Sequence, residues 1–386
     1  MKHARDAVVV AYGRSAMCRA NKGSFANTHP VEYAGLTLKG VLDRVPGLDP
    51  LRIDDVIVGC ANPEGKCYFN IGRLVAQRAG LPDDVTGQTV NRFCSSGLQA
   101  IATAANAIMA NQMDIVVGGG VEYMTGLDMN PNLAFADPTL AEIKPDTYIS
   151  MGMTAENVAA RYGISREEMD QMAVESHAKA AAAQDAGKFK DEIIPITVDG
   201  PNGPMLVTED EGIRRGTNME SLSKLKTCFL EDGVVTAATS SQMTDGASFL
   251  VLMARETAEQ LGYKPVAKFM GFAVGGVPSG VMGLGPIKAV PKVMARTGMT
   301  LNDMDVIELN EAFAAQAIAC MRDLKMPRGK VNPNGGAMAL GHPMGATGGF
   351  LSCKAFSELK RTGGKYALVT MCIGGGQGAA AIYEME

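Results

Sequence analysis

Short apolar runs rich in Val and Ile recur along the chain, and each ends at a glycine or polar cluster. They are DVIVGC (55–60), DIVVGGG (114–120), DVIELNE (305–311) and YALVTMCIGGG (366–376). This pattern predicts buried strands whose carboxyl ends open into loops. Longer amphipathic stretches between them, such as 95–112 and 345–363, predict helices. Alternating strands and helices indicate an α/β fold with right-handed crossovers and a largely parallel sheet.

The two halves of the chain repeat this order. LRIDDVIVGCANPEG (51–65) resembles LNDMDVIELNEAFAA (301–315), and the segment from Val90 through DIVVGGG resembles the segment from Val331 through YALVTMCIGGG. We infer two similar α/β lobes that are related by an internal pseudo-twofold and face each other across a cleft. Chance is the alternative, because α/β units share composition, but four features in matching order argue against it.

The middle of the chain has a different composition, rich in Met, Asn, Asp and Lys, with helical runs at 153–163 and 165–189. We interpret it as a long insertion in the first lobe, and insertions of this size usually carry binding or assembly functions. The expected domains are an N-terminal lobe (1–120 plus about 241–262), an inserted loop domain (121–240) and a C-terminal lobe (263–386).

Composition narrows the function classes. The 386 residues are 46% hydrophobic, which suits a globular protein with two core-bearing domains, and the net charge of −5 gives no reason to expect nucleic acid. No apolar stretch approaches the ~20 residues of a membrane helix, and the short apolar run near residue 8, without a small-residue cleavage pattern, does not predict a secretory signal. We therefore expect a cytoplasmic protein with reduced thiols. Eight cysteines without a CxxC pair and four histidines without HExxH spacing predict no metal site.

One cysteine stands at the start of a predicted helix. Cys94 in VNRFCSSGLQAI follows a short extended run and directly precedes the helix. The backbone N–H groups at a helix N-terminus favour thiolate, so this position predicts a nucleophile with a lowered pKa. The alternative is a small buried hydrophobe, which is what most free cysteines are.

The glycine-rich segment NPNGGAMALGHPMGATGG (332–349) places His342 in the loop that matches the Cys94 turn. Cys372 ends the matching strand of the second lobe. The pseudo-twofold would bring these three residues together, with His342 taking the proton of Cys94 and Cys372 acting as general acid or base. A solvated turn residue is the alternative for a lone loop histidine.

Asn310, at the end of another strand of the second lobe, could hold a water or a substrate carbonyl oxygen. Backbone N–H groups of Gly374 and Cys94 could serve as oxyanion donors. Asn310 could instead cap the following helix. The glycines of GGGQGAA fit a dinucleotide-binding pattern loosely, but a strand-like run follows them, which disfavours a dinucleotide site.

These motifs resemble those of the thiolase family essentially end to end. VNRFCSSGLQAI resembles its nucleophile block, ELNEAFAAQ its Asn block, NPNGGAMALGHPMGATGG its histidine block and MCIGGGQGAA its second-cysteine block, in the family's order. The resemblance implies a thiolase fold, with two lobes in an α/β/α/β/α layered arrangement plus an inserted loop domain. It also implies an acyltransferase, usually a homodimer or homotetramer, with coenzyme A and acyl-CoA as substrates and no permanent cofactor.

The resemblance implies a role for each candidate. Cys94 would accept the acyl group as a thioester, His342 would activate it, and Cys372 would move the proton at the α-carbon during carbon–carbon bond cleavage or formation. Asn310 would hold the water of one oxyanion hole, with His342 beside it. The backbone N–H groups of Cys94 and Gly374 would form the other.

Coenzyme A recognition is expected from the loop domain and the TSS stretch. A basic run could bind phosphates, although on its own such a run would be a solvated face; it comprises Arg214, Arg215, Lys224 and Lys226. Ser241, Met151 and Phe313 match family positions that line the pantetheine channel, where Ser150 replaces a histidine often found before Met151. The residues expected to contact coenzyme A are Arg214, Ser241, Met151, Phe313, Phe229 and Ser221.

The subclass is indicated by VTAATSSQMTDGA (235–247). Acetoacetyl-CoA thiolases usually have NASG where this chain has TSSQ, whereas bacterial fatty-acid-oxidation 3-ketoacyl-CoA thiolases have TSS. We therefore expect cleavage of 3-ketoacyl-CoA to acetyl-CoA and a shortened acyl-CoA, or the reverse condensation, with a β-oxidation multienzyme complex as a candidate partner. A short-chain acetyl-CoA acetyltransferase is the alternative. Cys372 argues against a ketoacyl synthase, and the full set of four side chains argues against a non-catalytic acyl-CoA-binding protein.

Overall fold

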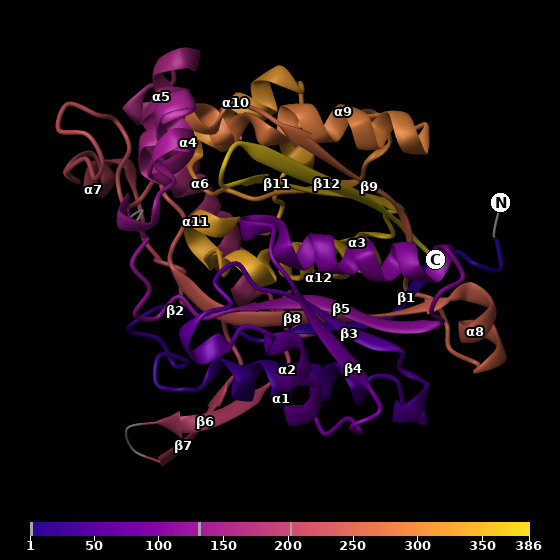
Figure 1. Cartoon of the computed structure of the whole chain (residues 1–386). Helices are drawn as coiled ribbons and strands as arrows, with labels where there is room; N and C mark the ends of the chain where they lie inside the picture. The colour runs from indigo at the N-terminus through magenta and orange to yellow at the C-terminus, as the bar shows by residue number, and fades with distance from the viewer. Residues whose placement is uncertain (1–2, 130–132, 201–202) are drawn as a thin grey trace.

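The computed structural model describes residues 3–129, 133–200 and 203–386, and its elements stack in five layers (Figure 1). A sheet lies on each side of a central layer made by helices α3 (Ser96–Met109) and α12 (Thr347–Thr362). Outer helices α9 (Gly285–Thr297) and α10 (Ala314–Asp323) cover one sheet, and α1 (Pro30–Leu42) and α2 (Ile71–Arg78) cover the other. The expected α/β/α/β/α arrangement is confirmed.

The strands run in one continuous order, β10-β11-β12-β9-β1-β8-β5-β3-β4. Those of the N-terminal half are β1 (Ala7–Arg14), β2 (Cys18–Arg19, paired with β8), β3 (Asp55–Gly59), β4 (Thr86–Val90), β5 (Ile115–Glu122) and β8 (Thr244–Ala254). Those of the C-terminal half are β9 (Ala267–Gly276), β10 (Val306–Leu309), β11 (Tyr366–Ile373) and β12 (Gln377–Met385). Only two residue pairs join β1 to β9, so the halves form separate layers.

The expectation of a largely parallel sheet is wrong, because the sheet is mixed. The pairs β3–β4, β3–β5 and β10–β11 are parallel, while β5–β8, β1–β8, β11–β12 and β12–β9 are antiparallel. Helix crossovers connect the parallel neighbours, as the alternating pattern predicts. Of the antiparallel pairs, β11 and β12 are joined directly by the short turn between Ile373 and Gln377.

The two halves of the structure correspond residue by residue, but the correspondence is shifted by one residue from the alignment of their sequence motifs. Asp54 accepts the N–H groups of Asp114 and Ile115, and Asp305 accepts those of Lys365 and Tyr366 in the same way. This alignment also superimposes the starts of α3 and α12 and keeps matching strand residues on the same sheet face. Matching the DVI motifs directly, as the sequence suggested, turns each side chain to the opposite face.

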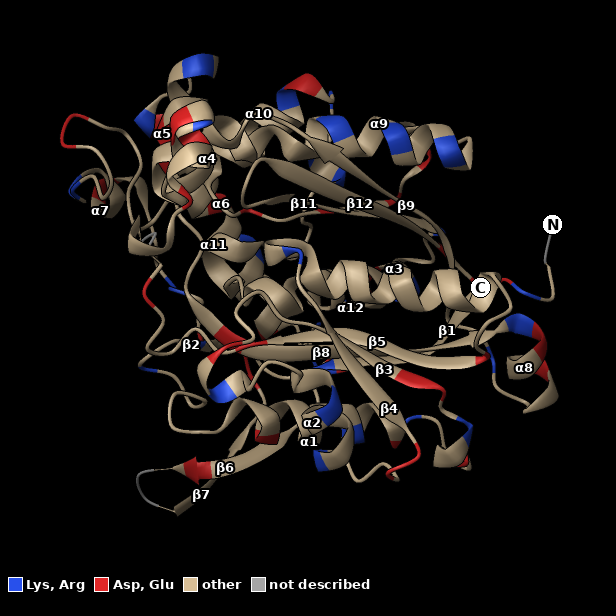
Figure 2. Cartoon of the chain, in the orientation of Figure 1, with Lys and Arg blue, Asp and Glu red and all other residues tan. Residues whose placement is uncertain are grey.

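The central helices approach each other closely at glycines. A Cβ on Gly97 would lie 2.5 Å from the carbonyl oxygen of Gly345, and one on Gly348 would lie 2.1 Å from the backbone nitrogen of Leu98. Helix α3 carries no charged residue, as Figure 2 shows, and most of it is buried. This packing brings the turn before each central helix against the strand ends of the opposite half.

Between β5 and β8 the N-terminal half carries a long excursion, where the C-terminal half has only the turn 374–376. It contains α4 (Pro138–Ile143), α5 (Met151–Tyr162), α6 (Arg166–Asp185), the hairpin of β6 (Ile196–Gly200) and β7 (Gly203–Val207), and α7 (Met219–Ser223). Helices α4 to α7 lie together at one side of the layers, left in Figure 1, and α5 packs against α10. The remaining helices are α8 (Arg255–Gln260) and α11 (Ala337–Leu340).

Candidate active site

A cavity of about 250 Å³ opens between the two lobes and the long excursion. Cys94 and His342, more than two hundred residues apart in sequence, both line it. Six methionines line it as well, at positions 124, 129, 151, 243, 282 and 344. Of the residues expected to contact coenzyme A, it contains Met151, Phe229, Ser241 and Phe313. The cavity is therefore apolar, with a thiol and an imidazole in its wall.

The turn before α3 positions Cys94. Phe93 has a φ of 43°, a left-handed conformation that is costly for a bulky residue. The Phe93 N–H donates to the side-chain oxygen of Asn91 at 2.8 Å, and the Asn91 amide donates to the Ala61 carbonyl at 2.9 Å. The turn is thus tied to the loop that follows β3, which keeps the Cys94 side chain at the cavity wall.

Burial raises the pKa of the Cys94 thiol to about 11; the carboxylate of Glu122 adds to this effect and a hydrogen bond from the Gly374 N–H opposes it. The expectation that a helix N-terminus would lower this pKa is wrong for the structure as it stands. The backbone donors are present, but loss of solvation outweighs them. Cys94 therefore rests as a thiol, and a base must remove its proton.

His342 is a neutral imidazole with a polar partner at each ring nitrogen. Its Nδ1 lies 2.6 Å from the hydroxyl of Thr347, and the side-chain nitrogen of Asn310 lies 3.4 Å from its Nε2. This arrangement fits the tautomer with a proton on Nδ1, which donates to Thr347, and a lone pair on Nε2, which accepts from the Asn310 amide. Burial lowers the pKa of His342 to about 4. His342 is not the solvated turn residue that a lone loop histidine could have been.

Asn310 is buried at the end of β10 beside His342. Its side-chain oxygen has no hydrogen-bond partner, although it is shielded from bulk solvent. The following helix, α10, has Phe313 at its N-cap, so Asn310 does not cap it. A buried amide oxygen without a partner is suited to bind a water molecule.

Cys372 lies near the end of β11, and Gly374 directly follows that strand, next to the Cys94 turn. Cys372 is fully buried, and burial together with the neighbouring Cys94 raises the pKa of its thiol well above the ordinary value. A Cβ on Gly374 would lie 3.6 Å from the sulfur of Met151 and 3.7 Å from the Phe93 ring. The structure thus gathers Cys94, His342, Asn310, Cys372 and Gly374 from the turn before α3, the glycine-rich loop and the ends of β10 and β11.

A model of the thiolase N-terminal domain matches residues 7–256, and a model of the thiolase C-terminal domain matches residues 263–385. The chain belongs to the thiolase family.

Named relatives cover its whole length. The chain is 46% identical to the 3-ketoacyl-CoA thiolase of Bacillus subtilis, over 99% of this chain and 100% of that one. It is 44% identical to the peroxisomal 3-ketoacyl-CoA thiolase of Homo sapiens, over 99% and 91% respectively. The crystal structure of the Bacillus anthracis acetyl-CoA acetyltransferase superimposes with a TM-score of 0.91 at 38% identity, covering 99% of each chain.

Two of the residues expected to contact coenzyme A lie away from the cavity lining. Arg214 is exposed, and its backbone N–H donates to Nδ1 of the buried His177. Ser221 is exposed in the capping box of α7, where it exchanges hydrogen bonds with Asn218. The basic run is exposed on the same excursion, and two of its members form surface ion pairs, Arg215 with Asp185 and Lys224 with Glu220.

Sequence reasoning missed residues that hold the thiolase site in place. Thr347, five residues after His342, contacts the imidazole directly. Glu311, next to Asn310, accepts hydrogen bonds from Ser176, Asn332 and the Met338 backbone and so joins the excursion to the histidine loop. Thr347 lies close in sequence to His342, and Glu311 lies next to Asn310. This proximity is the feature of the sequence that could have identified them.

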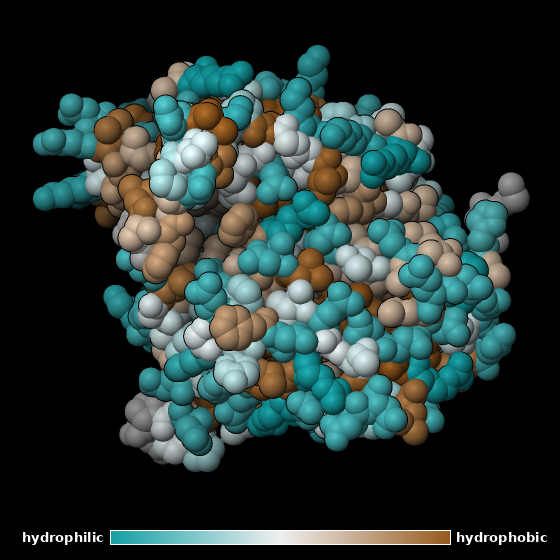
Figure 3. Space-filling model, viewed as in Figure 1, coloured by the Kyte–Doolittle hydropathy of each residue, from teal (hydrophilic) through white to brown (hydrophobic). Residues whose placement is uncertain are grey.

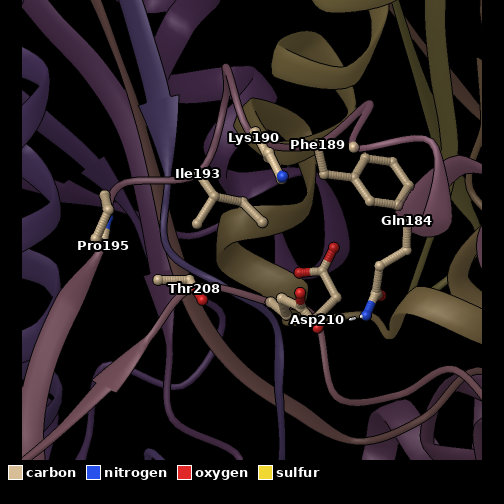
Figure 4. Close-up of a pocket in the computed structure, with 9 residues that line it drawn as sticks. Gln184, Phe189, Lys190, Ile193, Pro195, Thr208 and Asp210 are labelled. Atoms are coloured by element: carbon tan, nitrogen blue, oxygen red, sulfur yellow. Dashed lines mark hydrogen bonds between the residues drawn. The ribbon is translucent and has the colours of Figure 1, made fainter.

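A second cavity, of about 270 Å³, lies between the end of α6 and residues 208–210 (Figure 4). It is lined by Gln184, Gly187, Phe189, Lys190, Ile193, Pro195, Thr208, Glu209 and Asp210. Asp210 pairs with the fully buried Arg14, which also pairs with Glu192. This lining has neither a cysteine nor a histidine, and the carboxylate of Asp210 is already paired with the buried Arg14.

Over the described residues, no cluster of three or more His, Cys, Asp or Glu could hold a metal ion. Among the same residues, no helix is long and apolar enough to cross a membrane.

Proposed function

We propose that this thiolase-family protein cleaves 3-ketoacyl-CoA with coenzyme A to give acetyl-CoA and a shortened acyl-CoA, and that Cys94 carries the acyl group. The observation that carries the proposal is the meeting of Cys94, His342, Asn310 and Cys372 where β10, β11, α3 and α12 converge. Relatives named 3-ketoacyl-CoA thiolase, aligned over the full chain, support the substrate class.

In the first half of the reaction, Nε2 of His342 takes the Cys94 proton and the thiolate attacks the 3-keto carbon. The bond between C2 and C3 then breaks, leaving the acyl group on Cys94. The thiol of Cys372 gives its proton to the C2 carbanion, and acetyl-CoA leaves. A water held by the side-chain oxygen of Asn310 would stabilise the enolate oxygen that forms at C1 when this bond breaks, while the N–H groups of Cys94 and Gly374 would bind the oxyanion at C3.

In the second half, the thiol of coenzyme A loses its proton to Cys372 and its sulfur attacks the thioester carbonyl. The bond to Cys94 breaks, the shortened acyl-CoA leaves, and the proton on His342 returns to the Cys94 sulfur. The N–H groups of Cys94 and Gly374 would bind the thioester oxygen in this half. Each proton removed in one half is thereby restored in the other.

The domain roles follow from these assignments. We assign 1–120 with about 241–262, and 263–386, to the two catalytic lobes, and 121–240 to a loop domain that binds coenzyme A. Met151 and Phe229 support this role because they belong to the excursion and line the cavity. The exposed Arg214 is available for a phosphate of coenzyme A, whereas the capping contacts of Ser221 offer no comparable support.

A homo-oligomer is proposed from two exposed surfaces. Strand β4 is the outer strand of the N-terminal half, and the exposed rings of Tyr68, Phe69 and Phe93 belong to the loops around it. A strand edge with aromatic neighbours suits pairing with a second copy of the chain. A second apolar surface over α4 and α5 includes Leu133, Phe135 and Ile143 (Figure 3). Light scattering would give the copy number.

A cytoplasmic location and a β-oxidation multienzyme partner stay predictions. Relatives include enzymes named as peroxisomal from Homo sapiens and Arabidopsis thaliana, so the family occurs in more than one compartment. Fractionation of the source cells and co-purification of the tagged protein would test the two statements.

The deciding experiment for the function is steady-state thiolysis over a chain-length series of 3-ketoacyl-CoAs. We expect cleavage of substrates longer than acetoacetyl-CoA, because flexible methionine side chains can make room for added methylenes, each worth up to ~0.8 kcal/mol of burial. The structural likeness to an acetyl-CoA acetyltransferase favours the second candidate, a short-chain enzyme. Activity confined to acetoacetyl-CoA would select it, and no cleavage of any member would refute both.

A further inference from the structure

The carboxyl end of β5 carries a buried carboxylate that the reaction above does not use. Glu122 is fully buried, although it is the last residue of the strand. Burial raises its pKa, and hydrogen bonds from backbone amides oppose that effect. Burying a carboxylate is costly unless its oxygens accept hydrogen bonds, so the groups that donate to Glu122 indicate its role.

Glu122 accepts backbone hydrogen bonds from two loops of different lobes. One oxygen accepts from the Ala61 N–H at 2.8 Å and from the Gly345 N–H at 2.7 Å. The other accepts from the Asn62 N–H at 3.0 Å and lies 3.8 Å from the Cys60 sulfur. Residues 60–62 follow β3 in the N-terminal lobe, whereas Gly345 belongs to the glycine-rich loop of the C-terminal lobe.

The first of these loops supports Cys94. The Ala61 carbonyl accepts from Asn91, and Asn91 in turn accepts the N–H of Phe93, the residue before the nucleophile. Ala61 and Cys94 also belong to one small apolar cluster with Met124 and Met344. A shift of the loop after β3 would therefore move the Cys94 turn.

The second loop supports His342. Gly345 lies between His342 and Thr347, the two residues whose side chains meet at 2.6 Å. Gly345 has no room to move toward its surroundings, because a Cβ there would lie 2.7 Å from both the Cα of Cys60 and the carbonyl oxygen of Val121. Its N–H bond to Glu122 fixes the loop at this contact.

We propose that Glu122 is a positioning residue that holds the Cys94 turn and the His342 loop in one fixed relation across the two lobes. The proposal rests on the proposed thiolase reaction, in which His342 takes the Cys94 proton. A displacement of about 1 Å between a nucleophile and its base can cost on the order of 10²-fold in rate. Glu122 would act on the rate without touching substrate.

The test compares Glu122→Ala and Glu122→Gln with the wild-type protein. Glu122→Ala should lower kcat by about 10²-fold, with KM for coenzyme A within about threefold. Glu122→Gln keeps one accepting oxygen and should recover part of the loss, to about 10-fold below wild type. Because both variants remove a negative charge near Cys94, alkylation of Cys94 by iodoacetamide should reach its midpoint at a lower pH in each.

Asp54→Asn is the matched control, since Asp54 accepts two backbone N–H groups at the opposite end of β5. It should keep wild-type kcat and an unchanged alkylation profile, even if its melting temperature falls. A folded Glu122→Ala with wild-type kcat would overturn the proposal, as would equal losses in Glu122→Ala and Asp54→Asn.

If Glu122→Ala does not fold, Glu122→Gln decides in the same way, and wild-type kcat with an unshifted alkylation profile would reject the role. Failure of the proposed function would look different, because the wild-type protein would then cleave no 3-ketoacyl-CoA. Alkylation needs no turnover, so an unshifted profile in both variants would count against Glu122 in that case too.

Discussion

The carboxyl ends of β5 and β11 occupy equivalent places in the two lobes, yet only one of them meets a reactive side chain. At β11, the Gly374 N–H faces the thiol of Cys94 in the turn before α3. At β5, the carboxylate of Glu122 faces the Gly345 N–H in the turn before α12. When the starts of the two helices are aligned, Cys94 and Gly345 occupy equivalent positions in the two turns.

The difference shows how a duplicated fold can build one site from two matching junctions. Both junctions have a strand end, a helix N-terminus and close backbone contacts, so the geometry is shared. What distinguishes them is the residue in the turn, a thiol at one and a glycine at the other, and the group opposite it. Function therefore depends on side chains placed on the repeated framework.

The largest effect should come from making the β11 junction, which contains Cys94, resemble the β5 junction, which has Gly345 in the equivalent turn. Cys94→Ala removes the sulfur while leaving a residue that a helix start tolerates. We expect thiolysis to fall by about 10⁴-fold or more, because no acyl-enzyme can form. Thiolysis assays on the folded variant measure it; retention of a tenth of the activity would show that another residue carries the acyl group.

Cys372→Ala should separate the two chemical roles at the β11 junction. Acylation of Cys94 by acetyl-CoA should persist, because its base is His342, whereas turnover should fall by about 10²- to 10⁴-fold for want of the second proton carrier. Mass spectrometry follows the acyl-enzyme and a steady-state assay follows turnover. Loss of both steps in a folded variant would contradict the division.

Gly120→Ala tests the packing of the β5 junction. A Cβ there would lie 1.9 Å from the Gly345 carbonyl oxygen, which has little freedom to retreat. We expect a loss of about 1–3 kcal/mol in the free energy of unfolding, measured by chemical denaturation. Gly276→Ala is the control, because a Cβ at that strand end meets nothing within 4 Å. Equal stabilities for the two variants would show that the junction is loosely packed.

The smallest effect concerns how kcat/KM changes as the pH is lowered. With the pKa of His342 lowered to about 4 by burial, the imidazole stays neutral as pH falls from 8 to 5. kcat/KM should therefore change by only about a tenth over that range, and it should fall only near pH 4. An exposed histidine would instead give a midpoint near 6.5. Such a midpoint, in buffers where the protein stays folded, would contradict the burial of His342.

Sequence patterns predicted the parts of this site that depend on local order. The turn before α3, the glycine-rich loop and the strand ends were each visible as breaks in apolar runs, so Cys94, His342, Asn310 and Cys372 could all be named as candidates. Alternating strands and helices indicated the α/β class, and the family resemblance implied the five layers.

Properties that depend on three-dimensional environment could not be predicted in this way. The pKa of Cys94 was expected to fall, because a helix start is evident from sequence, but the burial that raises it is not. The alignment of the two lobes suggested by the sequence was wrong by one residue, because similar residue types do not show which sheet face a side chain takes. Glu122 was missed because the groups it binds are backbone amides.

The central claim is that Cys94 is the acylated residue, and the most direct measurement is peptide mass mapping of Cys372→Ala after incubation with acetyl-CoA. We predict a single acetyl group on the peptide that contains Cys94, absent when His342 is also replaced by alanine and the incubation is short. An acetyl group on another cysteine, with Cys94 unmodified, would contradict the account.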